Sequence, residues 1–145
     1  MSPRAAAWLA WTLAALSVVM FLSTVTFFVL LRAAQAEAPS NLVTSRSIID
    51  LFISVPFLAF PLVGALIASR RPRNPIGWIC LAVGLLWMLL GLFDFYSVYG
   101  LAKPGSVPFP VVIYALVEWL WLPTMGLLTI YLVLLFPDGR PPSRR

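Results

Sequence analysis

The chain has 145 residues, of which 61% are hydrophobic and only 10% are charged, and its net charge is +5. Soluble domains carry about 25% charged residues, so this composition excludes an ordinary soluble domain and predicts a membrane protein. The absence of histidine removes histidine-dependent catalysis and the commonest metal ligand. With no catalytic motif either, we expect no enzyme activity, no metal and no cofactor. The single cysteine, Cys80, does not identify a redox compartment.

Four apolar stretches are each long enough to cross a bilayer core, which takes about 20 helical residues. They run over about 7–31, 48–69, 76–99 and 111–136. The connections between them are too short to fold separately, so residues 1–145 are predicted to form a single membrane domain. The expected fold is an all-α bundle of four transmembrane helices, with a cytoplasmic tail over 137–145.

The basic residues are interpreted as topology signals, because no basic run is interleaved with exposed aromatics as nucleic-acid binding would require. With four spans, one side of the membrane holds seven bases and the other holds three. The seven are Arg4, Arg70, Arg71, Arg73, Arg140, Arg144 and Arg145, and the three are Arg32, Arg46 and Lys103. This asymmetry predicts that both termini are cytoplasmic, in a multi-pass protein of the inner (plasma) membrane.

The first span has an alternative interpretation as a signal peptide. A basic start precedes it, and Ala34-Gln35-Ala36 resembles a cleavage site. However, the apolar run is about twice the usual 7–15 residues, which favours an uncleaved anchor. Cleavage within residues 1–36 would leave three spans and an external N-terminus.

Two motifs bracket the second half of the chain, RNPIGWI at 73–79 and LLFPDGRPPSRR at 134–145. Their arrangement resembles the N-terminal membrane region of a group of bacterial sensor histidine kinases and related signalling proteins. In that group an NPIGW turn opens one transmembrane helix and an FPDGR-P-SRRW turn closes a later one. The matching residues are Asn74, Pro75, Ile76, Gly77 and Trp78, then Phe136, Pro137, Asp138, Gly139, Arg140, Pro142, Ser143, Arg144 and Arg145.

The resemblance covers most of the chain from the second span onward, but the kinases continue into further helices and an ATP-binding region. This sequence stops at Arg145 and has no phosphoacceptor histidine. The resemblance therefore implies a sensor-like module of a two-component system without kinase activity in this polypeptide, either shortened or acting with a partner in trans.

Both motifs also predict well-formed helix ends at the membrane interface. Asn74 is expected to act as an N-cap and Pro75 to occupy the first turn of the third span. Trp78 is expected at headgroup level, where an amphipathic ring is stable. Pro137 is expected to end the fourth span.

Three carboxylates, on Asp50, Asp94 and Glu118, fall in the outer halves of their predicted spans. A charged side chain at bilayer depth costs about 2.5–3.5 kcal/mol, so each is a candidate functional group. Asp50 has a structural alternative, because Arg46 lies four residues earlier and is expected to pair with it. Asp94 is expected to reach water or Lys103. Glu118 is expected to make a polar contact between helices or to bind a ligand or proton.

An aromatic and anionic pocket is predicted in the outer half, suited to a cationic or amphipathic ligand. Its expected lining is Asp94, Tyr96, Tyr99, Tyr114, Glu118 and Trp121. The alternative is an ordinary aromatic belt at the membrane interface.

A glycine stripe is predicted on the third span, because Gly77, Gly84 and Gly91 recur every seven residues and drift only about 20° per repeat. Small residues let helices approach closely, so the stripe is expected to contact the second or fourth span or a partner chain. Prolines inside the second and fourth spans are expected to kink them: Pro56, Pro61 and Pro123.

The favoured function is a membrane input or interaction module. Its expected partners are the lipid bilayer and a membrane or cytoplasmic signalling protein, with a homodimer as an alternative and with no nucleic acid. The second hypothesis is a small transporter or membrane-complex subunit that uses Glu118 and Asp94. The lack of polar groups deep in the cytoplasmic half argues against a transport path.

Overall fold

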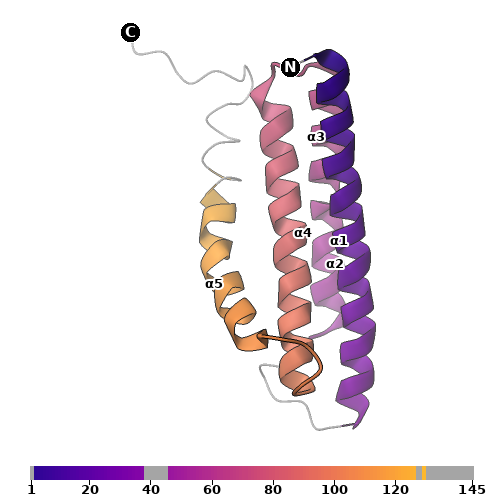
Figure 1. The fold of residues 1–145 in the computed structure, drawn as a ribbon, viewed down its shortest axis with the longest axis vertical. Coiled ribbons are helices and arrows are strands. Elements are labelled where there is room, and N and C mark those ends of the chain that lie inside the picture. Colours follow the sequence, from indigo (N-terminus) through magenta and orange to yellow (C-terminus); the bar gives the residue numbers. More distant parts are fainter. Residues whose placement is uncertain (1, 38–45, 127–128, 130–145) are drawn as a thin grey trace.

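The computed structural model describes residues 2–37, 46–126 and 129, and every regular element in that part of the chain is helical (Figure 1). The elements are α1 (Pro3–Glu37), α2 (Ile48–Phe57), α3 (Ala59–Arg70), α4 (Pro75–Ala102) and α5 (Pro110–Gly126). Three stretches of helix are long and apolar enough to cross a membrane: Arg4–Ala36, Ile48–Arg70 and Pro75–Ala102. The all-α prediction is therefore confirmed for the described residues, with three of the four expected spans.

The fourth expected span, over 111–136, corresponds to α5 as far as the chain is described. α5 has 17 residues, which is short of the roughly 20 needed to cross a bilayer core. It is apolar throughout most of its length, and Pro123 lies inside it without interrupting it. Residues 127–128 and 130–136 of the expected span lie outside the described residues.

The second expected span consists of two helices, because α2 and α3 are separated at Leu58. Pro61 has no N–H to donate to the carbonyl of Phe57, so the helical ladder is interrupted there. Leu58 nevertheless keeps right-handed helical angles, φ −66° and ψ −22°, and its N–H donates to the Val55 carbonyl at 3.1 Å. The two helices therefore continue in nearly the same direction (Figure 1) and form one apolar stretch of 23 residues.

The central helix is α4, which packs against α1 and α3 on one side and against α5 on the other (Figure 1). Near its start, small side chains of α1 and α3 allow close packing around a leucine of α4. This cluster is Ala10, Ala14, Ala65, Ala68 and Leu81. Near its end, a bulkier cluster joins α1 to α4 and is formed by Phe28, Leu31, Phe95 and Val98.

The two ends of the bundle hold different connections. The start of α1 and the turn between α3 and α4 lie at one end, at the top of Figure 1. The start of α2 and the connection between α4 and α5 lie at the other. The start of α1 is capped by Ser2, whose hydroxyl accepts a hydrogen bond from the Ala5 N–H at 3.2 Å. The NPIGW turn therefore lies at the opposite end of the bundle from the start of α2.

Candidate functional site

The turn between α3 and α4 has the local geometry expected from the NPIGW motif. Asn74 is the N-cap, because its Oδ1 accepts a hydrogen bond from the Ile76 N–H at 3.0 Å. Pro75 occupies the first turn, where its missing N–H would have no helical partner. The indole Nε1 of Trp78 donates to the Pro72 carbonyl at 3.0 Å, tying α4 to the turn before it. These residues build a helix start.

The second motif falls outside the described residues. Its predicted turn residues are Phe136, Pro137, Asp138, Gly139 and Arg140. The candidate site lies elsewhere, among Arg46 and residues of α2, α4 and α5.

The glycine stripe of α4 faces α3 at two of its three positions. A Cβ on Gly77 would lie 2.8 Å from a backbone nitrogen of α3, and one on Gly84 would lie 2.1 Å from Pro61 Cδ. Gly91 is different, since its nearest neighbour would be Ser54 Oγ at 3.9 Å, an ordinary contact. The helices are therefore tightly packed along α3 and more open beside α2.

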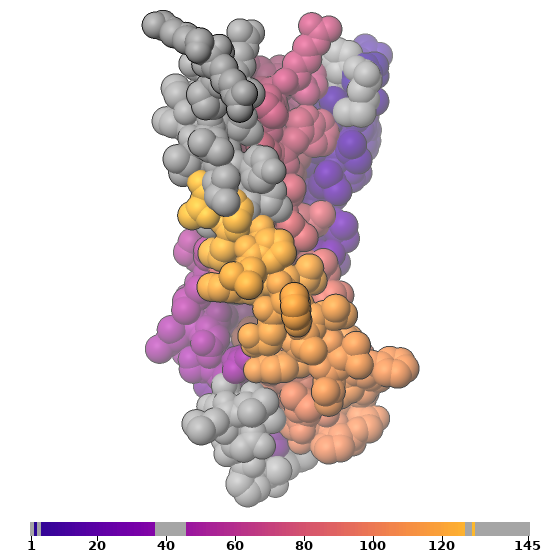
Figure 2. Space-filling view, turned by 90° about the vertical axis from the view of Figure 1, so that its left-hand side faces the viewer, coloured from indigo at the N-terminus to yellow at the C-terminus, as the bar shows by residue number. Residues whose placement is uncertain are grey.

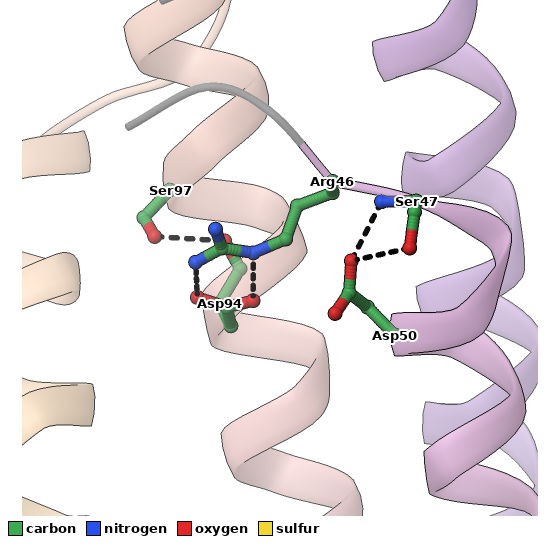
Figure 3. A network of polar contacts seen from close by, with 5 residues as sticks. All are labelled: Arg46, Ser47, Asp50, Asp94 and Ser97. Atoms are coloured by element: carbon green, nitrogen blue, oxygen red, sulfur yellow. Dashed lines mark hydrogen bonds and ion pairs between the residues drawn. The ribbon is translucent and has the colours of Figure 1, made fainter. Parts of the chain in front are cut away.

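An ion pair links the residue before α2 to α4 (Figure 3). Arg46 Nε donates to Asp94 Oδ2 at 2.9 Å, and Nη2 donates to Oδ1 at 2.8 Å. Bidentate pairs of this kind are among the strongest charge-assisted hydrogen bonds. Both side chains are 22% exposed, so the pair is largely withdrawn from solvent. The hydrogen bond to Asp94 raises the pKa of the Arg46 guanidinium, which therefore keeps its charge at any physiological pH.

Asp50 lies beside this ion pair, in the first turn of α2 (Figure 3). Its Oδ2 accepts hydrogen bonds from the Ser47 N–H at 2.6 Å and from the Ser47 hydroxyl at 3.0 Å. A carboxylate is favourable at a helix N-terminus, where backbone N–H groups are unpaired. Its Oδ1 has no hydrogen bond within the described part of the chain and points into the space between α2 and α4 (Figure 3).

A groove of about 330 Å³, called here the lateral groove, extends from the ion pair between α2, α4 and α5. Figure 2 shows α2 and α5 side by side on this face of the molecule. One end of the groove is charged and is formed by Arg46, Asp50 and Asp94. Its walls are mainly apolar and aromatic and include Ile53, Trp87, Leu90, Val117 and Trp121.

The indole of Trp87 is held in place by α2. Phe57, the last residue of α2, stacks on it with ring centroids 3.7 Å apart and planes 12° apart. Contact between aromatic rings of this kind stabilises their packing. One wall of the lateral groove is therefore an aromatic surface of fixed orientation.

Three tyrosines that were expected to line the pocket are not among the residues that line the lateral groove. The Tyr96 hydroxyl donates to the Pro108 carbonyl at 3.0 Å, and its ring meets Phe27 of α1 with centroids 5.3 Å apart. Tyr99 also lies against Phe27, with centroids 6.0 Å apart. Tyr114 packs against the cluster that joins α1 to α4. Tyr96 and Tyr99 therefore stabilise the bundle, whereas Tyr114 also lies close enough to Arg46 to interact with its charge.

Glu118 is exposed on α5 and lies outside the lateral groove. It borders a separate hollow of about 340 Å³ together with Val117 and Trp121. No hydrogen bond or ion pair joins it to another residue in the described part of the chain. Of the six expected pocket residues, the structure places only Asp94 and Trp121 in the lateral groove.

The lateral groove can recognise a ligand by charge, aromatic contact and shape. Among the described residues, no group of three or more Cys, Asp or Glu side chains is placed to hold a metal ion. Sequence reasoning missed Arg46 and Trp87 as parts of this site.

No protein-family model, curated protein or solved structure matches the chain.

Proposed function

We propose that this chain is a membrane input module that receives a ligand in the lateral groove and passes the change to a signalling partner. In this proposal α5 continues into a fourth span, and both termini lie in the cytoplasm with the turn between α3 and α4. The groove then opens near the outer face of the inner (plasma) membrane. The charge distribution supports this orientation, since seven of the ten bases would lie inside.

The ion pair between Arg46 and Asp94 is the observation that carries this proposal. It joins the start of α2 to α4 at the charged end of the groove, with contacts of 2.8 and 2.9 Å. A charged ligand in the groove competes for one of the two partners, and removing a partner from a largely buried pair is costly. In this proposal the pair has a formed and a broken state, and a ligand shifts the equilibrium by binding one state better than the other.

The fold offers a route from this contact to the far end of the bundle. α2 continues through Leu58 into α3, and α3 is pressed against α4 where Pro61 meets Gly84. α3 ends at Arg70, in the basic turn that would face the cytoplasm. Release of α2 from α4 at the groove would therefore change the position of this turn, because packed elements move as units.

Electron–electron distance measurements between two spin labels test the proposal. Labels are placed at Ser2→Cys and Arg71→Cys, both at the far end from the groove, in a Cys80→Ala background in lipid nanodiscs. We expect Asp94→Asn, which breaks the ion pair, to shift the distance distribution. The charge-swapped pair Arg46→Asp with Asp94→Arg should restore it.

Lys103→Gln is the matched control, since it removes a charge at the same end of the bundle from an exposed residue outside the groove. It should leave the distances unchanged. Identical distributions for the parent and Asp94→Asn would show that the groove is not coupled to the far end and would refute the proposed function.

A further inference from the structure

The charged end of the lateral groove has a net negative charge. It contains one cation, on Arg46, and two carboxylates, on Asp50 and Asp94. Asp94 is engaged by the guanidinium through both of its oxygens. Asp50 adds a second negative charge, and its Oδ1 points into the space between α2 and α4 (Figure 3). An incoming cation would therefore meet an available carboxylate oxygen.

The groove also has aromatic walls. Trp87 is fixed by its stacking on Phe57, and Trp121 lines the groove from α5. Indole faces attract ammonium groups, and the attraction is stronger where water is excluded. The carboxylate and the two indoles therefore both favour a cation in the groove over an anion.

The rest of the groove favours an apolar chain. Ile53, Leu90 and Val117 provide aliphatic walls from three different helices. The volume of about 330 Å³ is at the small end of the range for small-molecule sites, which is about 300–1,000 Å³. Ile53 is 54% exposed and Trp121 is 52% exposed, so the groove opens sideways between α2 and α5. In a bilayer that opening faces the lipid.

We infer that the lateral groove binds a single-chain amphiphile with a cationic ammonium head, which enters sideways from the bilayer. The head lies against Asp50, and the chain lies along the apolar walls toward Trp87 and Trp121. This inference rests on the proposed function, because it names the ligand class of the same groove. It also explains why an anionic site is built into an otherwise apolar face.

Fluorescence quenching of Trp87 tests the ligand class directly. The full chain is reconstituted in phosphatidylcholine nanodiscs with Trp87 as the sole tryptophan and phenylalanine at the other five positions. The probe is an alkyltrimethylammonium with bromine atoms on its chain, and the comparison is the brominated alkyl sulfate of the same length. We expect saturable quenching, with half-saturation by the cation at a concentration about tenfold lower than by the sulfate.

Neutralising the site should abolish this selectivity. Asp50→Asn is expected to raise the half-saturating concentration of the cation to that of the sulfate. A variant that keeps only Trp78, at the far end of the bundle, should show non-saturable quenching from partition into the bilayer. Equal quenching by cation and sulfate, or unchanged half-saturation in Asp50→Asn, would overturn the inference.

A second readout uses the chain with all of its tryptophans, in case the single-tryptophan variant folds poorly. Retention of radiolabelled alkyltrimethylammonium by loaded nanodiscs is compared with retention by empty ones. We expect excess retention that Asp50→Asn removes, and equal retention would count against the site. Cation binding without any change in the spin-label distances would refute the proposed function alone, whereas distance changes without cation selectivity would refute the ligand class alone.

Discussion

Pro61 of α3 lies so close to Gly84 of α4 that a Cβ on the glycine would be 2.1 Å from the proline Cδ and 2.6 Å from its nitrogen. The neighbour is a rigid ring held in the backbone, so it cannot turn aside as a flexible side chain does. Pro61 thus has two roles. It interrupts the helix of the second span, and it packs against α4 at a position where only a glycine leaves room for its ring. This contact sets the spacing of α3 and α4 at the break between α2 and α3.

Gly84→Ala should therefore destabilise the bundle. Overpacking of a close contact costs about 1–3 kcal/mol, because backbone or side chains must shift. Thermal unfolding in detergent micelles, followed by circular dichroism, measures the loss. Gly91→Ala is the matched control, since its new Cβ would lie 3.9 Å from Ser54 Oγ. Equal stability of the two variants would show that α3 and α4 are not in close contact at Gly84.

A double-mutant cycle on Arg46→Gln and Asp94→Asn should give a favourable coupling energy of about 1–2 kcal/mol. Exposed ion pairs give about 0.2–1 kcal/mol, and breaking a fully buried pair costs about 3–5 kcal/mol. With both side chains 22% exposed, this pair lies between these limits. The unfolding midpoints of the two single variants and the double variant provide the cycle. Additive losses would mean that the two side chains do not interact.

Local features of the fold could be predicted from the sequence. Asn74 and Pro75 specify a helix start through contacts that reach only two residues along the chain, so the motif alone is sufficient. The three apolar stretches were recognisable for a similar reason, because length and hydropathy are properties of a continuous segment. The helix ends at Pro3 and Ala102 extend past the apolar limits that the sequence suggested.

The contacts that form the groove could not be predicted in the same way. Arg46 and Asp94 are 48 residues apart, and spacing along one helix suggests only the neighbour at Asp50. Arg46 also precedes the N-cap Ser47, so helical spacing does not apply to it. Tyr96 is not among the groove residues for a different reason. Tyr96 is two residues beyond Asp94, which places the two side chains on nearly opposite faces of α4, and helix periodicity would have separated them.

Asn74→Ala should weaken the start of α4. Loss of an N-cap costs about 1 kcal/mol, because the Ile76 N–H loses its side-chain acceptor. Asn74→Ser is the matched control, since serine also caps helices and should keep most of the stability. Thermal unfolding followed by circular dichroism compares the stability of the alanine and serine variants. If alanine is tolerated as well as serine, the cap does not contribute to stability.

The two ends of α4 should lie on opposite sides of the membrane. α4 has 28 residues and is long and apolar enough to cross. Single cysteines at Arg71→Cys and Lys103→Cys, in a Cys80→Ala background, are treated with a membrane-impermeant maleimide on intact cells. We expect labelling at position 103 only, and labelling at position 71 only after the cells are opened. The reverse pattern would invert the proposed orientation, and labelling of both on intact cells would exclude a crossing by α4.

Glu118 provides the clearest separation between sensing and transport. It is exposed on α5 and does not line the lateral groove, so Glu118→Gln should leave the half-saturation of Trp87 quenching by the cationic probe unchanged. Thermal stability should be equal or higher, because an amide is less costly than a carboxylate in a bilayer. A transport function predicts that Glu118→Gln is inactive, since Glu118 would then carry the substrate or proton. Measurement of proton flux into proteoliposomes distinguishes sensing from transport. We expect no flux above empty liposomes for either the parent or Glu118→Gln, whereas flux in the parent that the substitution abolishes would establish transport.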